Sequence, residues 1–245
     1  MTDQSYQFPR FYATAPSPCP YLPGKEERKV YTDLCGPDVS ELNEALGQVG
    51  FRRSQSVSYR PACEGCSACI SVRVITEEFA QNKSQKKVWR QNREIKVETM
   101  DAFATSEQFE LLKKYLDARH SEGGMAEMDE FEYVEMVDSS PVHTTLVEYR
   151  EPPGDFDSLR PGKLLGAALT DVLSDGFSMV YSFFDTSSDR KSLGTYMILE
   201  HIKRAKAASL PHIYLGYWVK GSAKMDYKEK FQPLERLSPS GWKRD

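Results

Sequence analysis

The clearest pattern of hydrophobic and polar positions lies in residues 176–231. Four large side chains alternate with smaller ones in its first part: Phe177, Met179, Tyr181 and Phe183. This alternation is typical of a β-strand and predicts that all four lie on one face. Residues 193–199 are apolar almost all round a helix, and Ile213, Leu215 and Tyr217 alternate in a second strand. The stretch therefore predicts two parallel strands joined by a buried crossover helix.

The remaining pattern predicts further helices and strands. Helices are expected at residues 37–50, 83–93, 105–120 and 129–140, with a capping box formed by Thr105 and Gln108. Strands are expected at residues 70–76, 143–150 and 163–173, the last two paired. Residues 1–35 lack periodicity, residues 51–60 are polar and extended, and a short polar tail ends the chain. Together these elements predict an α+β fold.

We expect two domains. They should pack closely, because no linker-like composition separates them. Residues 1–100 would form an N-terminal cysteine-bearing domain, and residues 101–245 a domain for the chemistry. The chain has 245 residues, of which 40% are hydrophobic and 28% charged, with a formal charge of −4. That charge argues against a broad nucleic-acid surface but permits a local basic patch. No secretory signal or apolar run of membrane-spanning length is apparent, so we expect a cytoplasmic protein without membrane contact.

Three cysteines are spaced at two-residue intervals: Cys63, Cys66 and Cys69. Thiolates are soft ligands that suit zinc or an iron–sulfur cluster, and either normally takes four ligands. Cys19 or Cys35 would supply the fourth. The spacing does not distinguish zinc from a cluster, and the alternative is a set of ordinary thiols near a tight turn.

A basic run at residues 83–93 includes a tryptophan. Helical spacing gathers its charges largely on one side: Lys83, Lys86, Lys87, Arg90 and Arg93. Such a face could bind tRNA phosphates while Trp89 stacks on an unpaired base. The alternative is a solvated basic face with Trp89 in the core. Arg52 and Arg53 could bind phosphate or the carboxylate of an acidic substrate.

The start of the crossover helix is a candidate anion or carbonyl site, because a helix N-terminus presents unpaired N–H groups. Ser187, Ser188 and Asp189 are residues of the types that cap a helix. Gly216, inside a strand, indicates the close approach of a ligand or another backbone.

Two family resemblances give these features a function. The strand, the glycine-containing helix and the splayed strand resemble the GNAT acyltransferase fold, in which a Gln/Arg-x-x-Gly-x-Gly/Ala motif binds coenzyme A. Tyr196 stands where that motif needs a small residue, which argues against coenzyme A. The second resemblance covers nearly the whole chain. The segments CPYLPG, GFRRSQ, YRPACEGCSACISVRV, RHSEGGM, SLGTYMILEHI and YLGYWVKGSAKMDYKEKFQP resemble the bacterial aminoacyl-tRNA–protein transferases.

The second resemblance implies transfer of leucine from leucyl-tRNA to proteins that begin with Asp or Glu, which marks them for degradation. The tRNA ester is already activated, so the reaction needs no cofactor. The candidates for catalysis are Tyr227, Lys228, Asp185 and His120. The candidates for substrate binding are Arg52, Arg53, Lys224, Tyr196 and Tyr217. Arginyl transfer, a coenzyme A-dependent N-acetyltransferase and a noncatalytic zinc module that binds RNA are the alternatives.

Overall fold

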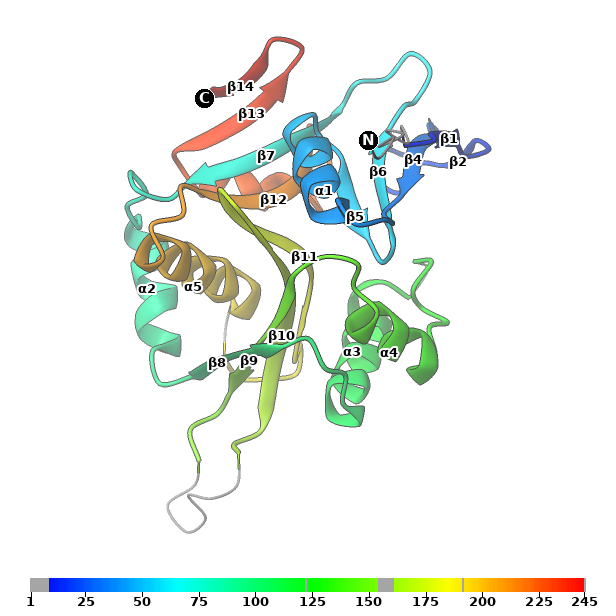
Figure 1. Ribbon diagram of the computed structural model, residues 1–245. Helices are drawn as coiled ribbons and strands as arrows, with labels where there is room; N and C mark the ends of the chain where they lie inside the picture. Colours follow the sequence, from blue (N-terminus) through cyan, green and yellow to red (C-terminus); the bar gives the residue numbers. More distant parts are fainter. Residues whose placement is uncertain (1–8, 122, 154–160, 191, 245) are drawn as a thin grey trace, which may run out of the picture.

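A computed structural model describes residues 9–121, 123–153, 161–190 and 192–244 (Figure 1). Its largest element is an eight-stranded sheet in the order β14-β13-β7-β12-β11-β10-β9-β8. Neighbouring strands are antiparallel except β11 and β12, which are parallel. The strands are β7 (Cys69–Ile75), β8 (Lys96–Asp101), β9 (Thr144–Arg150), β10 (Leu164–Leu173), β11 (Gly176–Phe184), β12 (His212–Val219), β13 (Leu234–Ser238) and β14 (Gly241–Arg244).

Two smaller sheets come from the N-terminal part of the chain. Their orders are β1-β4-β6-β5 and β2-β3. The strands are β1 (Tyr12–Ala13), β2 (Ser17–Pro18), β3 (Glu26–Glu27), β4 (Lys29–Asp33), β5 (Arg52–Ser54) and β6 (Val57–Pro61). Residues 12–33, predicted to be irregular, thus contribute four of these strands, and the extended segment at 51–60 contributes a hairpin. Short strands separated by turns leave little periodicity in a sequence.

Helices cover both faces of the large sheet (Figure 1). The helices are α1 (Val39–Gln48), α2 (Lys83–Asn92), α3 (Ser106–Arg119), α4 (Glu130–Asp138), α5 (Leu193–Ala207) and the 3₁₀ helix η1 (Asp226–Lys230). α2 and α5 pack on one face, and α3 and α4 pack on the other. The predicted capping box of Thr105 and Gln108 is present at α3, and Asp129 and Glu132 form another at α4. The predicted helices and paired strands are confirmed.

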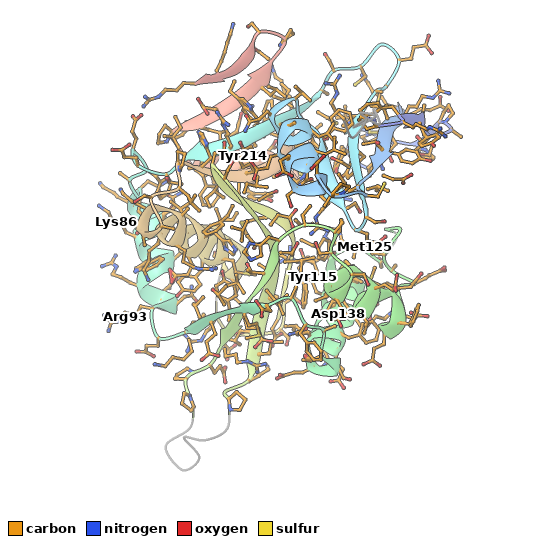
Figure 2. The ribbon with its side chains drawn as sticks, in the orientation of Figure 1. Lys86, Arg93, Tyr115, Met125, Asp138 and Tyr214 are labelled. Carbon is orange, nitrogen blue, oxygen red and sulfur yellow. The ribbon has the colours of Figure 1, made fainter. Side chains whose placement is uncertain are left out.

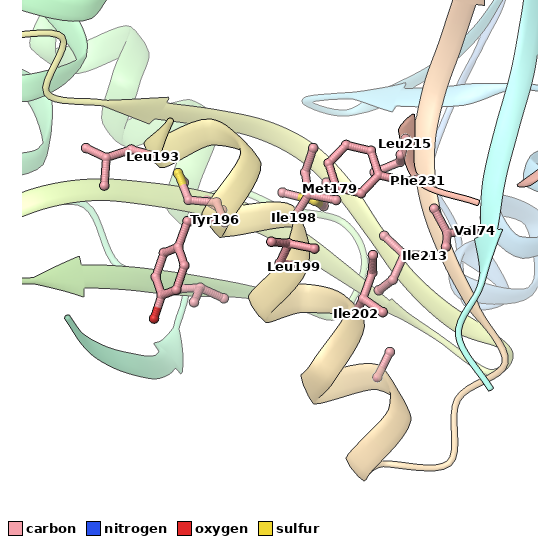
Figure 3. Close-up of a cluster of buried hydrophobic side chains, with 14 of the residues drawn as sticks. Val74, Met179, Leu193, Tyr196, Ile198, Leu199, Ile202, Ile213, Leu215 and Phe231 are labelled. Atoms are coloured by element: carbon pink, nitrogen blue, oxygen red, sulfur yellow. The ribbon is translucent and has the colours of Figure 1, made fainter. Parts of the chain in front are cut away.

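The predicted unit of strand, crossover helix and parallel strand is confirmed as β11, α5 and β12. The helix begins later than its serines suggest: Ser192 is the N-cap, with a φ of 63° and no side-chain cap hydrogen bond. Gly194 brings α5 close to β11, because a Cβ there would lie 3.0 Å from the ring of Phe184. Figure 3 shows the apolar side chains that α5 contributes to the core, including Tyr196, Ile198 and Leu199.

The prediction that four large side chains of β11 share one face is wrong, because β11 is irregular beside Leu169. Leu169 pairs with Tyr181 and the next residue of β10 pairs with Met179, so that Val180 is an extra residue. An extra residue reverses the alternation of faces. Met179 packs in the core below α5, whereas Phe183 packs in the core below α3 and α4.

The short polar tail at the C-terminus has regular structure that the sequence pattern did not predict. It forms β13 and β14, and β13 pairs with β7. β8, which the sequence pattern did not predict, pairs with β9 at the opposite edge. The large sheet therefore contains strands from both sides of the domain boundary predicted near residue 100, which stays a prediction.

Candidate functional site

A cleft of about 620 Å³ lies where the N-terminal hairpin, the large sheet and the α3–α4 layer meet. Figure 2 shows Tyr115 of α3 and Met125 of the following loop in this region. One part of the lining, here called the cationic end, consists of Tyr21, Arg52, Tyr59, Tyr217, Tyr227 and Lys228. Another part, the apolar end, consists of Tyr115, Met125, Met128, Met136, Leu169, Val180 and Tyr181. The cleft thus joins two chemically different surfaces.

Arg52 fills the gap between β11 and β12. These two strands pair only from Gly176 to Ser178 in β11 and then separate. Beyond that point the Arg52 Nη2 atom donates a 2.9 Å hydrogen bond to the Met179 carbonyl oxygen of β11. On the other side the guanidinium lies against Gly216 of β12, where a Cβ would be only 0.9 Å from Nη1. The close approach predicted at Gly216 is therefore made by the Arg52 side chain.

Lys228 of η1 is buried beside Arg52, with 4% of its surface exposed. Its Nζ atom donates a 2.5 Å hydrogen bond to the Tyr217 carbonyl oxygen and lies 3.3 Å from the Met225 sulfur. Burial lowers the pKa of Lys228 well below its ordinary value, and the charge of Arg52 lowers it further. An amine in this position can exist in the neutral form that accepts a proton.

Arg53 faces the opposite way from Arg52 and is buried in an ion pair. Its Nε and Nη2 atoms donate 2.7 Å and 2.6 Å hydrogen bonds to the two carboxylate oxygens of Asp171. Its other bonds go to the Thr144 hydroxyl group and the Gln55 carbonyl oxygen. Since its guanidinium is engaged on every side, Arg53 anchors the hairpin to β10 and offers little to a substrate.

Tyr227 and His120 also line the cleft. The Tyr227 ring lies 5.7 Å from the Lys228 ammonium group. The His120 ring lies 5.5 Å from that of Tyr115. Burial lowers the pKa of His120 from 6.5, and the positive charge of Lys224 lowers it further, so Lys224 is also nearby. The structure thus brings most of the predicted catalytic and substrate-binding residues to one region, with Tyr217 beneath them.

Asp185 and Tyr196 are not brought to the cleft. Burial raises the pKa of Asp185, but hydrogen bonds from Lys163 and Ser187 outweigh burial and lower it to about 2. Asp185 accepts a 2.7 Å hydrogen bond from Lys163, and its ionised form is a weak base. Tyr196 is 2% exposed and packs against the rings of Trp89 and Tyr149 in the core.

The predicted basic face of α2 is exposed on the side of the molecule that carries α5. Figure 2 shows Lys86 and Arg93 projecting outward from this helix. The other basic residues of the run, Lys83, Lys87 and Arg90, are also exposed. Trp89 points inward and packs on Tyr196 with ring centroids 5.4 Å apart, as in the alternative that places it in the core.

The cysteines gather without forming a ligand set. Burial raises the pKa of Cys69 to about 11, and Cys63, Cys19 and Cys66 add to the rise, so these thiols are neighbours. Within the described ranges, however, no three His, Cys, Asp or Glu side chains have the arrangement needed to hold a metal ion. Cys35 is exposed and does not contribute to the shift. The geometry does not support the predicted zinc ion or iron–sulfur cluster.

The apolar end was not predicted from the sequence. Glu132 and Met136 lie four residues apart on α4, Met128 lies just before the helix, and all three line the cleft. This spacing was visible in the sequence, but an apolar face on a helix ordinarily indicates core packing. Tyr21 and Tyr59 were likewise not predicted as cleft residues. No helix in the described part of the chain is long and apolar enough to cross a membrane.

Comparison with known proteins agrees with this assembly. The family model described as "Arginine-tRNA-protein transferase, C terminus" matches residues 107–238, and the one described as its N terminus matches residues 17–87. An aspartate/glutamate leucyltransferase of Rhizorhabdus wittichii is 58% identical over all of this chain and 91% of its own. Another, from Sphingomonas elodea, is 54% identical over 96% of this chain and 90% of its own.

Among solved structures, L-PGS from Bacillus licheniformis superposes with a TM-score of 0.51 at 11% identity, covering 71% of this chain and 58% of that one. This likeness supports the mixed architecture of the fold. The two matched regions include the residues of both ends of the cleft, from Tyr21, Arg52 and Tyr59 to Met136 and Lys228. Because relatives more than 50% identical also align over its whole length, this chain belongs to the arginine-tRNA–protein transferase family.

Proposed function

We propose that this protein is an aminoacyltransferase that moves leucine from leucyl-tRNA to the α-amino group of proteins that begin with Asp or Glu. The family and the names of its relatives support this function. The observation that carries it in the structure is the cationic end of the cleft, where Arg52 and Lys228 stand together. An acidic N-terminal side chain requires such a partner, and a reacting amine requires a base beside it.

Arg52 is the residue we assign to the acidic side chain of the acceptor. A guanidinium has five N–H donors in a fixed plane. One of them is used on the Met179 carbonyl oxygen, and Gly216 leaves room for the guanidinium between the two strands. This fixed position leaves further donors for a carboxylate, which arginine binds with two parallel hydrogen bonds.

Lys228 is the residue we assign to the proton. The acceptor arrives as an α-ammonium group, with an ordinary pKa of about 7.7–8.0. Neutral Lys228 takes one proton from it, and the freed amine attacks the ester carbonyl carbon of leucyl-tRNA. The new C–N bond forms, the ester C–O bond breaks, and the tRNA 3′ oxygen leaves with a proton. Tyr227 and His120 would donate hydrogen bonds to the oxygens that gain charge.

Other parts of the molecule would bind the tRNA and shape the cleft. The exposed basic face of α2 and Lys224 would contact tRNA phosphates. The unit of β11, α5 and β12 would be a version of the GNAT acyltransferase fold, with the cysteine-bearing N-terminal part completing its cleft. The reaction needs no cofactor, takes place in the cytoplasm where aminoacyl-tRNA is available, and marks the acceptor protein for degradation.

The test uses purified full-length protein, radiolabelled leucyl-tRNA or arginyl-tRNA, and peptides that begin with Asp, Glu, Arg or Ala. We expect leucine on the Asp and Glu peptides only. Exchanging Arg52 for Lys keeps the charge but removes the planar pair of donors, and should raise KM for these peptides more than it lowers kcat. Transfer of arginine, equal labelling of the Ala peptide, or no transfer from either tRNA would each overturn the proposal.

A further inference from the structure

The residues of the apolar end belong to the core cluster packed around α3 and α4, and they also line the cleft. Met128, Met136 and Leu169 are nearly buried, yet each presents surface to the cavity, and Val180 and Tyr181 continue this wall from β11. The extra residue at Val180 turns this part of β11 toward α3 and α4. Methionine side chains adapt to an apolar group of irregular shape. The wall is therefore suited to a branched aliphatic side chain.

Glu132 lines the cleft next to this wall and is exposed to solvent. It lies four residues before Met136, so the two share one face of α4, and Met128 lies just before the helix and lines the same cleft. Among the residues described, it is the only acidic side chain that lines the cleft, whereas Arg52, Arg53, Lys228 and His120 are basic. One Glu132 oxygen accepts a 3.1 Å hydrogen bond from the Asp129 backbone N–H as part of the capping box. The other carboxylate oxygen has no such role in the cap.

An aminoacyl ester carries two features beside its carbonyl group: a side chain and a positively charged α-ammonium group. In leucyl-tRNA the first is apolar and the second needs an anion or several acceptors once it leaves water. The apolar end supplies both kinds of partner in one place. Among the described residues, the cationic end has no acidic side chain that could bind this ammonium group.

We infer that Met128, Met136, Leu169 and Val180 bind the leucyl side chain of the donor, and that Glu132 binds its α-ammonium group. This assignment rests on the proposed function and gives the two substrates opposite ends of one cleft. Tyr115 of the apolar end is within electrostatic range of Tyr227 of the cationic end, so the two ends adjoin there. The ester carbonyl group would then lie near Tyr227 and Lys228, next to the amine held from the cationic end.

The role of Glu132 is tested with a donor that lacks the α-ammonium charge. Leucyl-tRNA is compared with 2-hydroxyisocaproyl-tRNA, in which a hydroxyl group replaces the ammonium group with little change in size. The ammonium group also activates the ester, so the informative quantity is how the ratio of the two kcat/KM values differs between enzymes. Glu132→Gln keeps the capping box, because glutamine serves at this position as well as glutamate. Glu135→Gln, on the same helix but outside the cleft, is the matched control.

We expect Glu132→Gln to lower the preference for leucyl-tRNA about tenfold, as for a lost charge-assisted hydrogen bond at an exposed position, and Glu135→Gln to leave it unchanged. An unchanged preference in Glu132→Gln would overturn the role of Glu132. If the wild type transferred leucine to neither the Asp nor the Glu peptide, the proposed function itself would fail. The two failures are therefore distinguishable.

The apolar wall is tested by the size of the side chain. Met136→Ala enlarges the pocket beside Glu132, so that a larger side chain fits. We therefore expect kcat/KM for phenylalanyl-tRNA relative to leucyl-tRNA to rise by about tenfold. Met197→Ala, a buried methionine of α5 outside the cleft, controls for general loosening of the core. The same rise in both variants, or none in Met136→Ala, would contradict the assigned pocket.

Discussion

Gly216 provides the sharpest test of how the cationic end is built. In Gly216→Ala the new methyl group would meet the Arg52 guanidinium at 0.9 Å, so the arginine has to leave the gap between β11 and β12. Gly216 also has a φ of +81°, where a side chain costs about 1–2 kcal/mol. Gly221 is a natural control, because its φ is +82° and a Cβ there meets nothing within 4 Å.

The two variants should therefore share the backbone cost and differ by the displacement of Arg52. Losing the hydrogen bond from the charged Arg52 to Met179 costs about 1.5–3 kcal/mol. We expect unfolding free energies lower by about 1–2 kcal/mol in Gly221→Ala and about 2.5–5 kcal/mol in Gly216→Ala. For a chain of this length each 1 kcal/mol lowers Tm by about 2–4 °C.

The assays are urea unfolding for stability and leucine transfer to an Asp peptide for function, at a temperature where both variants are folded. We expect Gly216→Ala to lose kcat/KM by at least about tenfold while Gly221→Ala stays close to the wild type. In an Arg52→Ala background, Gly216→Ala should cost only the backbone strain, because the clash is gone. Equal activity of the two glycine variants, or strict additivity of Gly216→Ala with Arg52→Ala, would refute the role of Arg52 between β11 and β12.

Three other predictions concern charge. The pKa of Lys228 is lowered in the folded state, so the unfolded chain binds more protons. The unfolding free energy of the wild type relative to Lys228→Met should therefore rise with pH up to about 10.5. A difference between the two proteins that stays constant in urea titrations from pH 7 to 9.5 would contradict the lowered pKa. Asp171→Asn should destabilise the fold by about 3–5 kcal/mol by leaving Arg53 buried without its partner, whereas Arg53→Met with Asp171→Leu should recover much of this, as measured by chemical unfolding. Exchanging Lys86, Lys87 and Arg90 for Glu should weaken tRNA binding and reduce its salt dependence, and an unaltered salt slope in filter binding would place the tRNA elsewhere.

The sequence predicted where helices and strands lie better than it predicted which side chains share a face. The dense apolar run at residues 193–199 and the alternation at 213–217 correctly predicted α5 and β12, because buried elements leave strong periodicity. The alternation in β11 misled, since a bulge such as that at Val180 has no signature in the hydrophobic pattern. β13 and β14 escaped notice because they are short and mostly polar on their exposed sides.

The candidate site was predicted in its chemistry and missed in its geometry. Arg52, Lys228 and Gly216 were each singled out, but only the fold shows that the first lies against the third and beside the second. Tyr196 was assigned to a pocket and packs in the core instead. Glu132 was overlooked because an acidic residue in the first turn of a helix is common and does not by itself indicate a binding site.

The position of β7 in the large sheet has a consequence for synthesis. β7 is made early, at residues 69–75, yet both of its neighbours, β12 and β13, come from the last 35 residues. While the chain leaves the ribosome, this strand has no partner and its backbone groups and apolar face stay open. We therefore expect the sheet to close only at the end of translation, and a message truncated after α5 to give a product that chaperones or proteases remove.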